Sequence, residues 1–275
     1  RELLLRTAED LCSFVGARPS IVACDLHPDY ASSILAAKLA ERWRARVVRV
    51  QHHHAHVASC MAEHGLSRDG EVLGLAWDGT GLGTDGTIWG GEALLVRRDG
   101  FTRFAHLRAF PLPGGDRAAR EPRRSALGAL VALAPEHVET FARPWLGDDL
   151  SIHLRAIEQR VSAPWCSSVG RLFDACAALL GARERMSFEG QAAMDLENLA
   201  TRAPAEPGYA IPLVRGPDGA LVGDTRPLFV SLIHDVCSAV APERVARRLH
   251  EALVDFGVAV AKRAAIPRVV LSGGC

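Results

Sequence analysis

Residues 46–56 read Arg-Val-Val-Arg-Val-Gln-His-His-His-Ala-His, and this stretch decides how the rest of the chain is interpreted. Its first five residues are typical of a short strand, and the histidines that follow precede a helical segment that stops at Gly65. His52 and His56 are four residues apart, so on a helical turn both imidazoles lie on one face. Imidazole is a common ligand of divalent transition metals, and the spacing therefore predicts a metal site rather than a surface histidine run.

The segments around this stretch alternate between helix and strand. Apolar residues recur at helical spacing over residues 1–15 and 32–43, while residues 20–24 and 46–50 are short apolar runs typical of buried parallel strands. This alternation predicts an α/β fold with a parallel sheet. Ligands bind such sheets at the carboxyl ends of the strands, where both the loop 25–30 and the histidine run fall.

The pattern changes near residue 70. Residues 72–77, 87–96 and 102–110 are strand-like, and glycine turns join them, which is typical of an antiparallel meander. We therefore predict two lobes: residues 1–69 form a partial lobe one, and residues 70–275 form lobe two with the meander, a helical insertion and a C-terminal strand at 268–271. Because the chain stops on a glycine loop directly after that strand, we expect a fragment truncated at both ends.

The glycine-rich segment after residue 77 has two possible meanings. Residues 81–86 match the Gly-x-Gly-x-x-Gly pattern, but a dinucleotide-binding loop should open a helix, and residues 87–89 resemble a strand instead. We therefore reject a Rossmann site. An Asp-Gly-Thr-Gly hairpin at 78–81 can offer backbone N–H groups to a phosphate and a carboxylate to a metal, although a plain glycine hairpin explains it equally well.

The overall composition excludes several classes of protein. The chain of 275 residues has 32 basic and 32 acidic side chains, so no net charge favours nucleic acid. No apolar run approaches the ~20 residues that a membrane span needs. The seven cysteines are scattered and form no Cys-x-x-Cys pair, which favours reduced thiols in a cytoplasmic protein. We expect neither a nucleic-acid partner nor a membrane partner.

Several motifs taken in order resemble one known family, the HypF carbamoyltransferases of [NiFe]-hydrogenase maturation, over their Kae1-like domain. The motifs that carry this resemblance are His52–His56, Asp78–Gly81, Gly170–Asp174, Phe188–Met194 and Ser272–Cys275. The resemblance implies an actin-like ATPase (ASKHA) fold, with two lobes that hold nucleotide and metal between them. It also implies a YrdC-like domain upstream in the full-length chain, and a further metal-binding carboxylate beyond residue 275.

The resemblance further implies an enzyme and its chemistry. The YrdC-like domain would make carbamoyl-adenylate from ATP and carbamoyl phosphate, and the Kae1-like domain would pass the carbamoyl group to the C-terminal cysteine of a HypE-type acceptor protein. His52, His56 and Asp78 would hold a divalent metal, with Fe, Zn and Mg as the candidates. Asp78 and His27 are the candidate catalytic residues, although an Asx-type loop role is as plausible for residues 25–27.

The implied nucleotide site draws on four segments. Its candidate residues are Gly79, Thr80, Gly81, Gly170, Asp174, Glu189, Gly190, Ser272, Gly273 and Gly274. Residues 79–81 and 272–274 would cradle the phosphate, and Gly170 would let the backbone approach the nucleoside. Asp174 would accept the ribose hydroxyls, and Glu189-Gly190 would flank the adenine. A salt bridge on the helix face is an equally good explanation of Asp174.

Four other functions are weighed against this one. A tRNA threonylcarbamoyl transferase of the same superfamily typically has Glu where His54 stands, and an antibiotic O-carbamoyltransferase shares the chemistry. A zinc metalloprotease needs His-Glu-x-x-His, but His53 occupies the glutamate position. A non-catalytic docking module would not need His52, His56 and Asp78 together.

Overall fold

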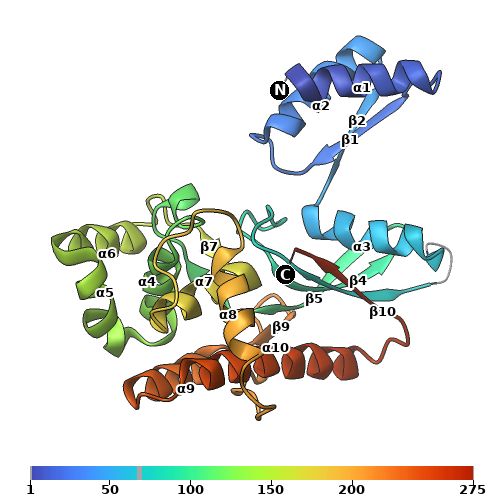
Figure 1. The fold of residues 1–275 in the computed structure, drawn as a ribbon. Helices are drawn as coiled ribbons and strands as arrows, with labels where there is room; N and C mark the ends of the chain where they lie inside the picture. The colour runs from blue at the N-terminus through green and yellow to red at the C-terminus, as the bar shows by residue number, and fades with distance from the viewer. Residues whose placement is uncertain (1, 67–69, 275) are drawn as a thin grey trace.

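The computed structural model describes residues 2–66 and 70–274, whose strands form three sheets, and two of these sheets position the site (Figure 1). The smaller sheet pairs β1 (Ile21–Asp25) with β2 (Arg46–Val50) in parallel. The helices α1 (Glu2–Phe14) and α2 (Ala31–Trp43) accompany it, as the helix–strand alternation predicted. Residues 67–69 and Cys275 lie outside the described residues. The predicted lobe boundary falls between residues 69 and 70, so it stays a prediction.

The larger sheet has six strands in the order β10-β3-β4-β5-β9-β8. The strands β3 (Val72–Trp77), β4 (Gly91–Arg97) and β5 (Gly100–Leu107) form the predicted antiparallel meander. The strand β10 (Val269–Gly273) pairs in parallel with β3, so the carboxyl ends of these two strands meet at one edge of the sheet.

One predicted strand begins later than expected. The sequence suggested a strand from residue 87, but β4 starts at Gly91, and residues 78–90 form a loop. Ile88 makes isolated bridges to Leu82 and to Cys166, because it lies between two segments rather than along one partner strand. No helix follows the glycine pattern at residues 81–86, in agreement with the rejected Rossmann site.

The helix α3 (His52–Glu63) follows β2 directly but packs on the larger sheet. Its buried residues Val57 and Met61 join a core cluster with side chains of β3, β4 and β10. A Cβ on Gly74 of β3 would lie 2.3 Å from Val57 Cγ2, so the glycine admits the valine. The histidines at the start of α3 are thus held where the two sheets approach each other.

A helical body is inserted between β5 and the hairpin of β8 (Leu213–Arg215) and β9 (Leu221–Gly223). A short pair, β6 (Phe110–Pro111) and β7 (Trp165–Cys166), lies at its base. Its helices are α4 (Pro122–Leu133), α5 (Val138–Leu146), α6 (Leu150–Glu158), α7 (Val169–Leu179) and α8 (Gln191–Ala200). Every residue of α7 is buried, so this helix is the centre of the main core.

Two further helices, α9 (Arg226–Cys237) and α10 (Pro242–Ala264), follow the hairpin and lead the chain into β10. Within the described chain, none of the helices combines the length and apolarity needed to cross a membrane. The described cysteines, Cys12, Cys24, Cys60, Cys166, Cys176 and Cys237, are all free thiols.

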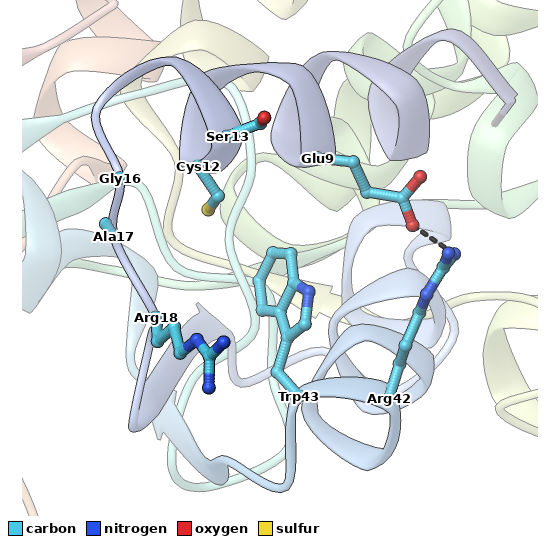
Figure 2. A pocket seen from close by; sticks show the side chains of 8 residues that line it. All are labelled: Glu9, Cys12, Ser13, Gly16, Ala17, Arg18, Arg42 and Trp43. Atoms are coloured by element: carbon cyan, nitrogen blue, oxygen red, sulfur yellow. Dashed lines mark hydrogen bonds and ion pairs between the residues drawn. The ribbon is translucent and has the colours of Figure 1, made fainter.

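A pocket of about 400 Å³ lies on the smaller unit, between the C-terminal halves of α1 and α2 (Figure 2). Arg42 of α2 pairs with Glu9 of α1 across this pocket, and Trp43 and Arg18 line its other side. None of the predicted site residues lines this pocket, so it is separate from the site described next.

Candidate metal centre

Gln51 fixes the start of the histidine helix. Its side-chain oxygen accepts a hydrogen bond from the His54 N–H at 2.9 Å, which caps α3 and makes His52 the first helical residue. Its amide nitrogen donates to the Leu82 carbonyl at 3.1 Å. Gln51 is buried, so one side chain ties the end of β2, the first turn of α3 and the loop after β3 together.

The three predicted ligands converge at this point. His52 and His56 lie one turn apart on α3, and Asp78 directly follows β3. Asp78 Oδ2 is 3.1 Å from the Nε2 atom of each histidine, and the three donor atoms all lie within 4.8 Å of one another. Ligand atoms on a tetrahedral zinc ion are about 3.3 Å apart, so these spacings fit a first-row divalent metal. Two imidazole nitrogens and one carboxylate oxygen suit Zn²⁺ or Fe²⁺ better than Mg²⁺, which prefers oxygen ligands.

The other two histidines of the run face elsewhere. His53 is completely buried beside Trp89, and burial lowers its pKa to about 4. A Cβ on Gly81 would lie 2.5 Å from His53 Cε1, so Gly81 makes room for this ring. His54 packs on Phe101, with the ring centroids 4.8 Å apart. Both are therefore packing residues, a distinction that the sequence pattern left open.

The charges of the cluster favour a cation. The hydrogen bond to Asp78 raises the pKa of His52 to about 9, against the opposing effect of burial, and Asp25 adds to the rise. Burial acts to raise the pKa of Asp78, but hydrogen bonds from His52 and the Gly79 N–H outweigh it and lower that pKa. Without a metal, a proton on His52 Nε2 faces the carboxylate, and a bound metal would take its place.

Asp25 touches the cluster from the end of β1. Its Oδ2 atom is 2.8 Å from His52 Nδ1, and its Oδ1 atom accepts the His27 N–H at 2.8 Å. The His27 ring stacks on Tyr30 with a centroid distance of 4.3 Å, and its Nδ1 accepts the Asp29 N–H. His27 is not among the described residues that form the metal cluster, and its catalytic role stays a prediction.

Two glycine segments meet beside Asp78. The Gly170 N–H donates to the Asp78 carbonyl at 3.2 Å, and Ser168 Oγ donates to the same carbonyl. The close approach that Gly170 permits is therefore to the 78–79 main chain, while a contact with a nucleoside stays a prediction. At the end of β10, a Cβ on Gly274 would lie 3.2 Å from Asp78 Oδ1, so the segment 272–274 also reaches the cluster.

Asp174 of α7 forms the salt bridge that the sequence offered as an alternative. Its Oδ2 atom lies 2.8 Å from Nη1 of Arg171, one turn earlier. Asp174 is 2% exposed, and burial raises its pKa to about 6 although Arg171 opposes the rise. Within residues 2–66 and 70–274, the buried Arg171 Nε–H has no hydrogen-bond acceptor.

The remaining predicted residues lie further out. Thr80 is exposed in the loop after β3. Glu189 is exposed, and Gly190, with φ +79°, is the N-cap of α8. The helix α8 begins at Gln191, because the left-handed Gly190 before it does not have helical backbone angles. No described contact joins Glu189 or Gly190 to the metal cluster, so their nucleotide role stays a prediction.

Sequence reasoning missed three residues that shape the site, namely Gln51, Ser168 and Arg171. Gln51 directly precedes the histidines, and a polar residue before a helical pattern is a signal for an N-cap. Ser168 stands in the same position before α7, where its hydroxyl accepts the Arg171 N–H at 3.2 Å. Both caps were readable from the sequence, whereas their contacts across the chain were not.

Comparison with known proteins gives a consistent result over the whole chain. Residues 1–63 match the family profile described as "HypF Kae1-like domain", and residues 74–275 match "Carbamoyltransferase, Kae1-like Domain, second subdomain". The chain is 41% identical to carbamoyltransferase HypF2 of Cupriavidus necator, covering 100% of the chain and 37% of the relative. It is 40% identical to a carbamoyltransferase HypF homolog of the same organism, covering 100% of the chain and 71% of the relative.

Solved structures agree with these matches. A full-length HypF in a phosphate- and nucleotide-bound form superposes with a TM-score of 0.90 at 36% identity, covering 98% of this chain and 35% of that one. HypF of T.kodakarensis gives a TM-score of 0.82 at 31% identity, with 99% and 37% covered. The chain spans little more than a third of the first curated relatives it matches. These likenesses confirm the predicted α/β, Kae1-like fold.

Proposed function

The chain belongs to the HypF carbamoyltransferase family, and from this premise we propose that it forms the metal-dependent site where a carbamoyl group leaves carbamoyl-adenylate for a thiol. One observation carries the proposal: the imidazoles of His52 and His56 and the carboxylate of Asp78 converge beside two glycine segments. Such an arrangement can hold a metal and an anionic phosphate side by side.

The reaction is an acyl transfer. The thiolate sulfur of the acceptor attacks the carbamoyl carbon and forms an S–C bond. The bond from that carbon to the phosphate oxygen breaks, and AMP leaves with the electron pair. A bound metal would supply Lewis-acid stabilisation of the negative charge that develops on oxygen.

The chain's own residues have separate roles in this proposal. His52, His56 and Asp78 would hold the metal, and Fe or Zn would suit these ligands better than Mg because imidazole nitrogen prefers transition metals. Thr80 and Gly81, together with Ser272, Gly273 and Gly274, would offer main-chain N–H groups to the phosphate. Gly79 donates its own N–H to Asp78 Oδ1 and would contribute only the close approach of its main chain. Gly170, Glu189 and Gly190 would bind the nucleoside, whereas Asp174 is buried in its salt bridge with Arg171 and could reach the nucleoside only if that pair opened. His27 contacts the carbamoyl group or the acceptor.

The proposed partners follow from the family. The acceptor is the C-terminal cysteine of a HypE-type protein, and a YrdC-like domain of the full-length chain supplies carbamoyl-adenylate from ATP. The whole process takes place in the cytoplasm.

The test measures transfer by the full-length protein. The protein is supplied with ATP, labelled carbamoyl phosphate and a peptide ending in cysteine, and label on the peptide is counted. The double variant His52→Ala with His56→Ala should lose more than about 100-fold in rate, because a Lewis-acid contribution of about 3 kcal/mol disappears. His64→Ala is the matched control, since His64 is an exposed residue just past α3 and should leave the rate unchanged.

Three results would contradict the proposal. Transfer at the wild-type rate by the double variant would remove the metal site from the reaction. Transfer to a hydroxyl acceptor in place of the cysteine peptide would favour an O-carbamoyltransferase, and absence of any transfer by the intact wild type would favour a docking module.

A further inference from the structure

We propose that Asp25 is a positioning residue for the metal centre: its carboxylate keeps the proton of His52 on Nδ1 and thereby presents Nε2 to the metal. The inference rests on the proposed metal site. It concerns a residue of the small sheet, outside the set of three predicted ligands.

The two oxygens of Asp25 have different partners. Oδ1 accepts the main-chain N–H of His27 at 2.8 Å, and Oδ2 lies 2.8 Å from His52 Nδ1. A main-chain N–H can only donate, so Oδ1 is committed as an acceptor. Oδ2 is also only an acceptor when the carboxylate is ionised, and His52 Nδ1 must therefore carry a hydrogen. With Nδ1 protonated, Nε2 is the nitrogen whose lone pair a metal can use, and Nε2 is the atom that faces Asp78.

The main chain that carries this carboxylate is held from two sides. The residue after it, Leu26, donates its N–H to the Val50 carbonyl at 2.9 Å, and Ser33 Oγ donates to the Asp25 carbonyl at 3.2 Å. The side chain of Asp25 is mostly buried, with 14% exposed. Buried outer carboxylates of this kind set ring orientation in metal sites, and their removal typically costs about 10- to 100-fold in metal affinity.

The contact also joins two parts of the fold. Asp25 is the last residue of β1 in the small sheet, whereas His52 begins α3, which packs on the large sheet. Asp78 directly follows β3 of the large sheet. The imidazole of His52 therefore lies between a carboxylate of each sheet, and the orientation of a metal ligand depends on where the small sheet lies.

Replacement of Asp25 by asparagine gives a sharp test because asparagine has one acceptor and one donor end. The His27 N–H needs the acceptor, so the NH₂ group turns towards His52 Nδ1. Nδ1 must then accept, and the proton moves to Nε2, where it opposes the metal. Alanine also removes the charge, but it leaves Nδ1 to water and does not force the proton onto Nε2. Asparagine should therefore be the more damaging substitution, although it is the closer in shape.

The experiment measures Zn²⁺ affinity of the full-length protein by competition with a coloured chelator at fixed pH. Asp25→Asn should bind about 10- to 100-fold more weakly than the wild type, and Asp25→Ala should fall between the two. Asp29→Asn is the matched control, because it removes an exposed carboxylate of the same loop, and it should bind like the wild type. Imidazole ¹⁵N spectra of the zinc-loaded wild type should show the His52 proton on Nδ1. Far-ultraviolet circular dichroism verifies that each variant is folded.

Three outcomes would overturn the proposal. A Zn²⁺ affinity of Asp25→Asn within about twofold of that of Asp29→Asn would show that the carboxylate does not position His52. Tighter binding by Asp25→Asn than by Asp25→Ala would show that charge or packing, and not the proton position, is what matters. A wild type that binds Zn²⁺ no better than the His52→Ala, His56→Ala double variant would remove the metal centre itself, whereas loss of carbamoyl transfer with intact binding would count only against the proposed function.

Discussion

The main chains of Gly170 and Gly79 lie in direct contact: a Cβ on Gly170 would come within 2.8 Å of Gly79 Cα. The same glycine donates its N–H to the carbonyl of Asp78. The first turn of α7 thus determines where the loop after β3 runs, and with it where the Asp78 carboxylate lies. A buried helix of the core is in this way coupled to a predicted metal ligand.

Gly170→Ala should therefore damage the site through the backbone. The added methyl group must push residues 78–79 away from α7, at a cost of about 1–3 kcal/mol in the free energy of unfolding. Displacement of Asp78 should also weaken Zn²⁺ binding by about tenfold. Gly257→Ala in α10 is the control, because its Cβ would meet only ordinary contacts, the nearest at 3.4 Å, and helical alanine should be neutral or stabilising. Equal stability and affinity for the two variants would refute this coupling.

The packing of α3 on the large sheet depends on the close contact between Gly74 and Val57. Gly74→Ala places a methyl group 2.3 Å from Val57 Cγ2, and overpacking of this kind should destabilise the protein by about 1–3 kcal/mol. Val57→Ala alone should also destabilise, because it leaves a cavity. The double variant should be more stable than the sum of the two effects, since each change relieves the other. Urea unfolding of the four proteins measures this coupling, and simple additivity would contradict the assigned contact.

Asp174 should make stability depend on pH in a definite direction. Burial raises its pKa from 3.8 to about 6, so the folded protein holds this proton in a range where the unfolded chain has lost it. The free energy of unfolding should therefore fall as the pH rises from about 4 to about 6, by about 3 kcal/mol for this group. Asp174→Asn should lack this component, so the wild-type curve should decline relative to that of the variant. Parallel curves across this range would rule out the shifted pKa.

Gln51→Ala should loosen the first turn of α3. It removes the cap on the His54 N–H and leaves the Leu82 carbonyl without its donor, so the free energy of unfolding should drop by about 1–2 kcal/mol. Amide hydrogen exchange should accelerate at residues 53–55 before it changes at the C-terminal end of the helix. An exposed glutamine, Gln159, follows α6 and provides the control substitution. Unchanged exchange at the start of α3 would show that the cap is dispensable.

Much of the fold and of the candidate site was readable from local patterns. The strand at 46–50 and the i, i+4 spacing of His52 and His56 follow from short-range chemistry, and Asp78 stood out because it ends an apolar strand. The contact between Asp25 of β1 and His52 of α3 joins residues 27 apart, which no local pattern encodes. The packing of α3 on the large sheet was equally unpredictable from local patterns, because it depends on the fit of Val57 into the space over Gly74.

The late start of β4 has a similar cause. Residues 87–89 have strand-like side chains, but the Ile88 N–H and carbonyl are used by Trp165 and Ser167 of the helical body. Because Trp165 and Ser167 occupy these two main-chain groups, Ile88 cannot use them for regular pairing with a neighbouring strand. Sequence patterns describe what a segment prefers, and here a more distant segment determined the result.

The strands β5 and β9 run side by side, with Leu107 opposite Gly223, although more than a hundred residues separate them. The helical body thus leaves the sheet and returns to it at almost one point. Chain insertions are tolerated best where entry and exit lie close together, which suggests how a simple meander could have acquired such an addition during evolution. Replacement of the addition by a tight turn would remove α7, whose residues are all buried in the main core, together with Gly170 and the wall behind Asp78. The stability of the sheet and the geometry of the candidate site therefore depend on the same insertion.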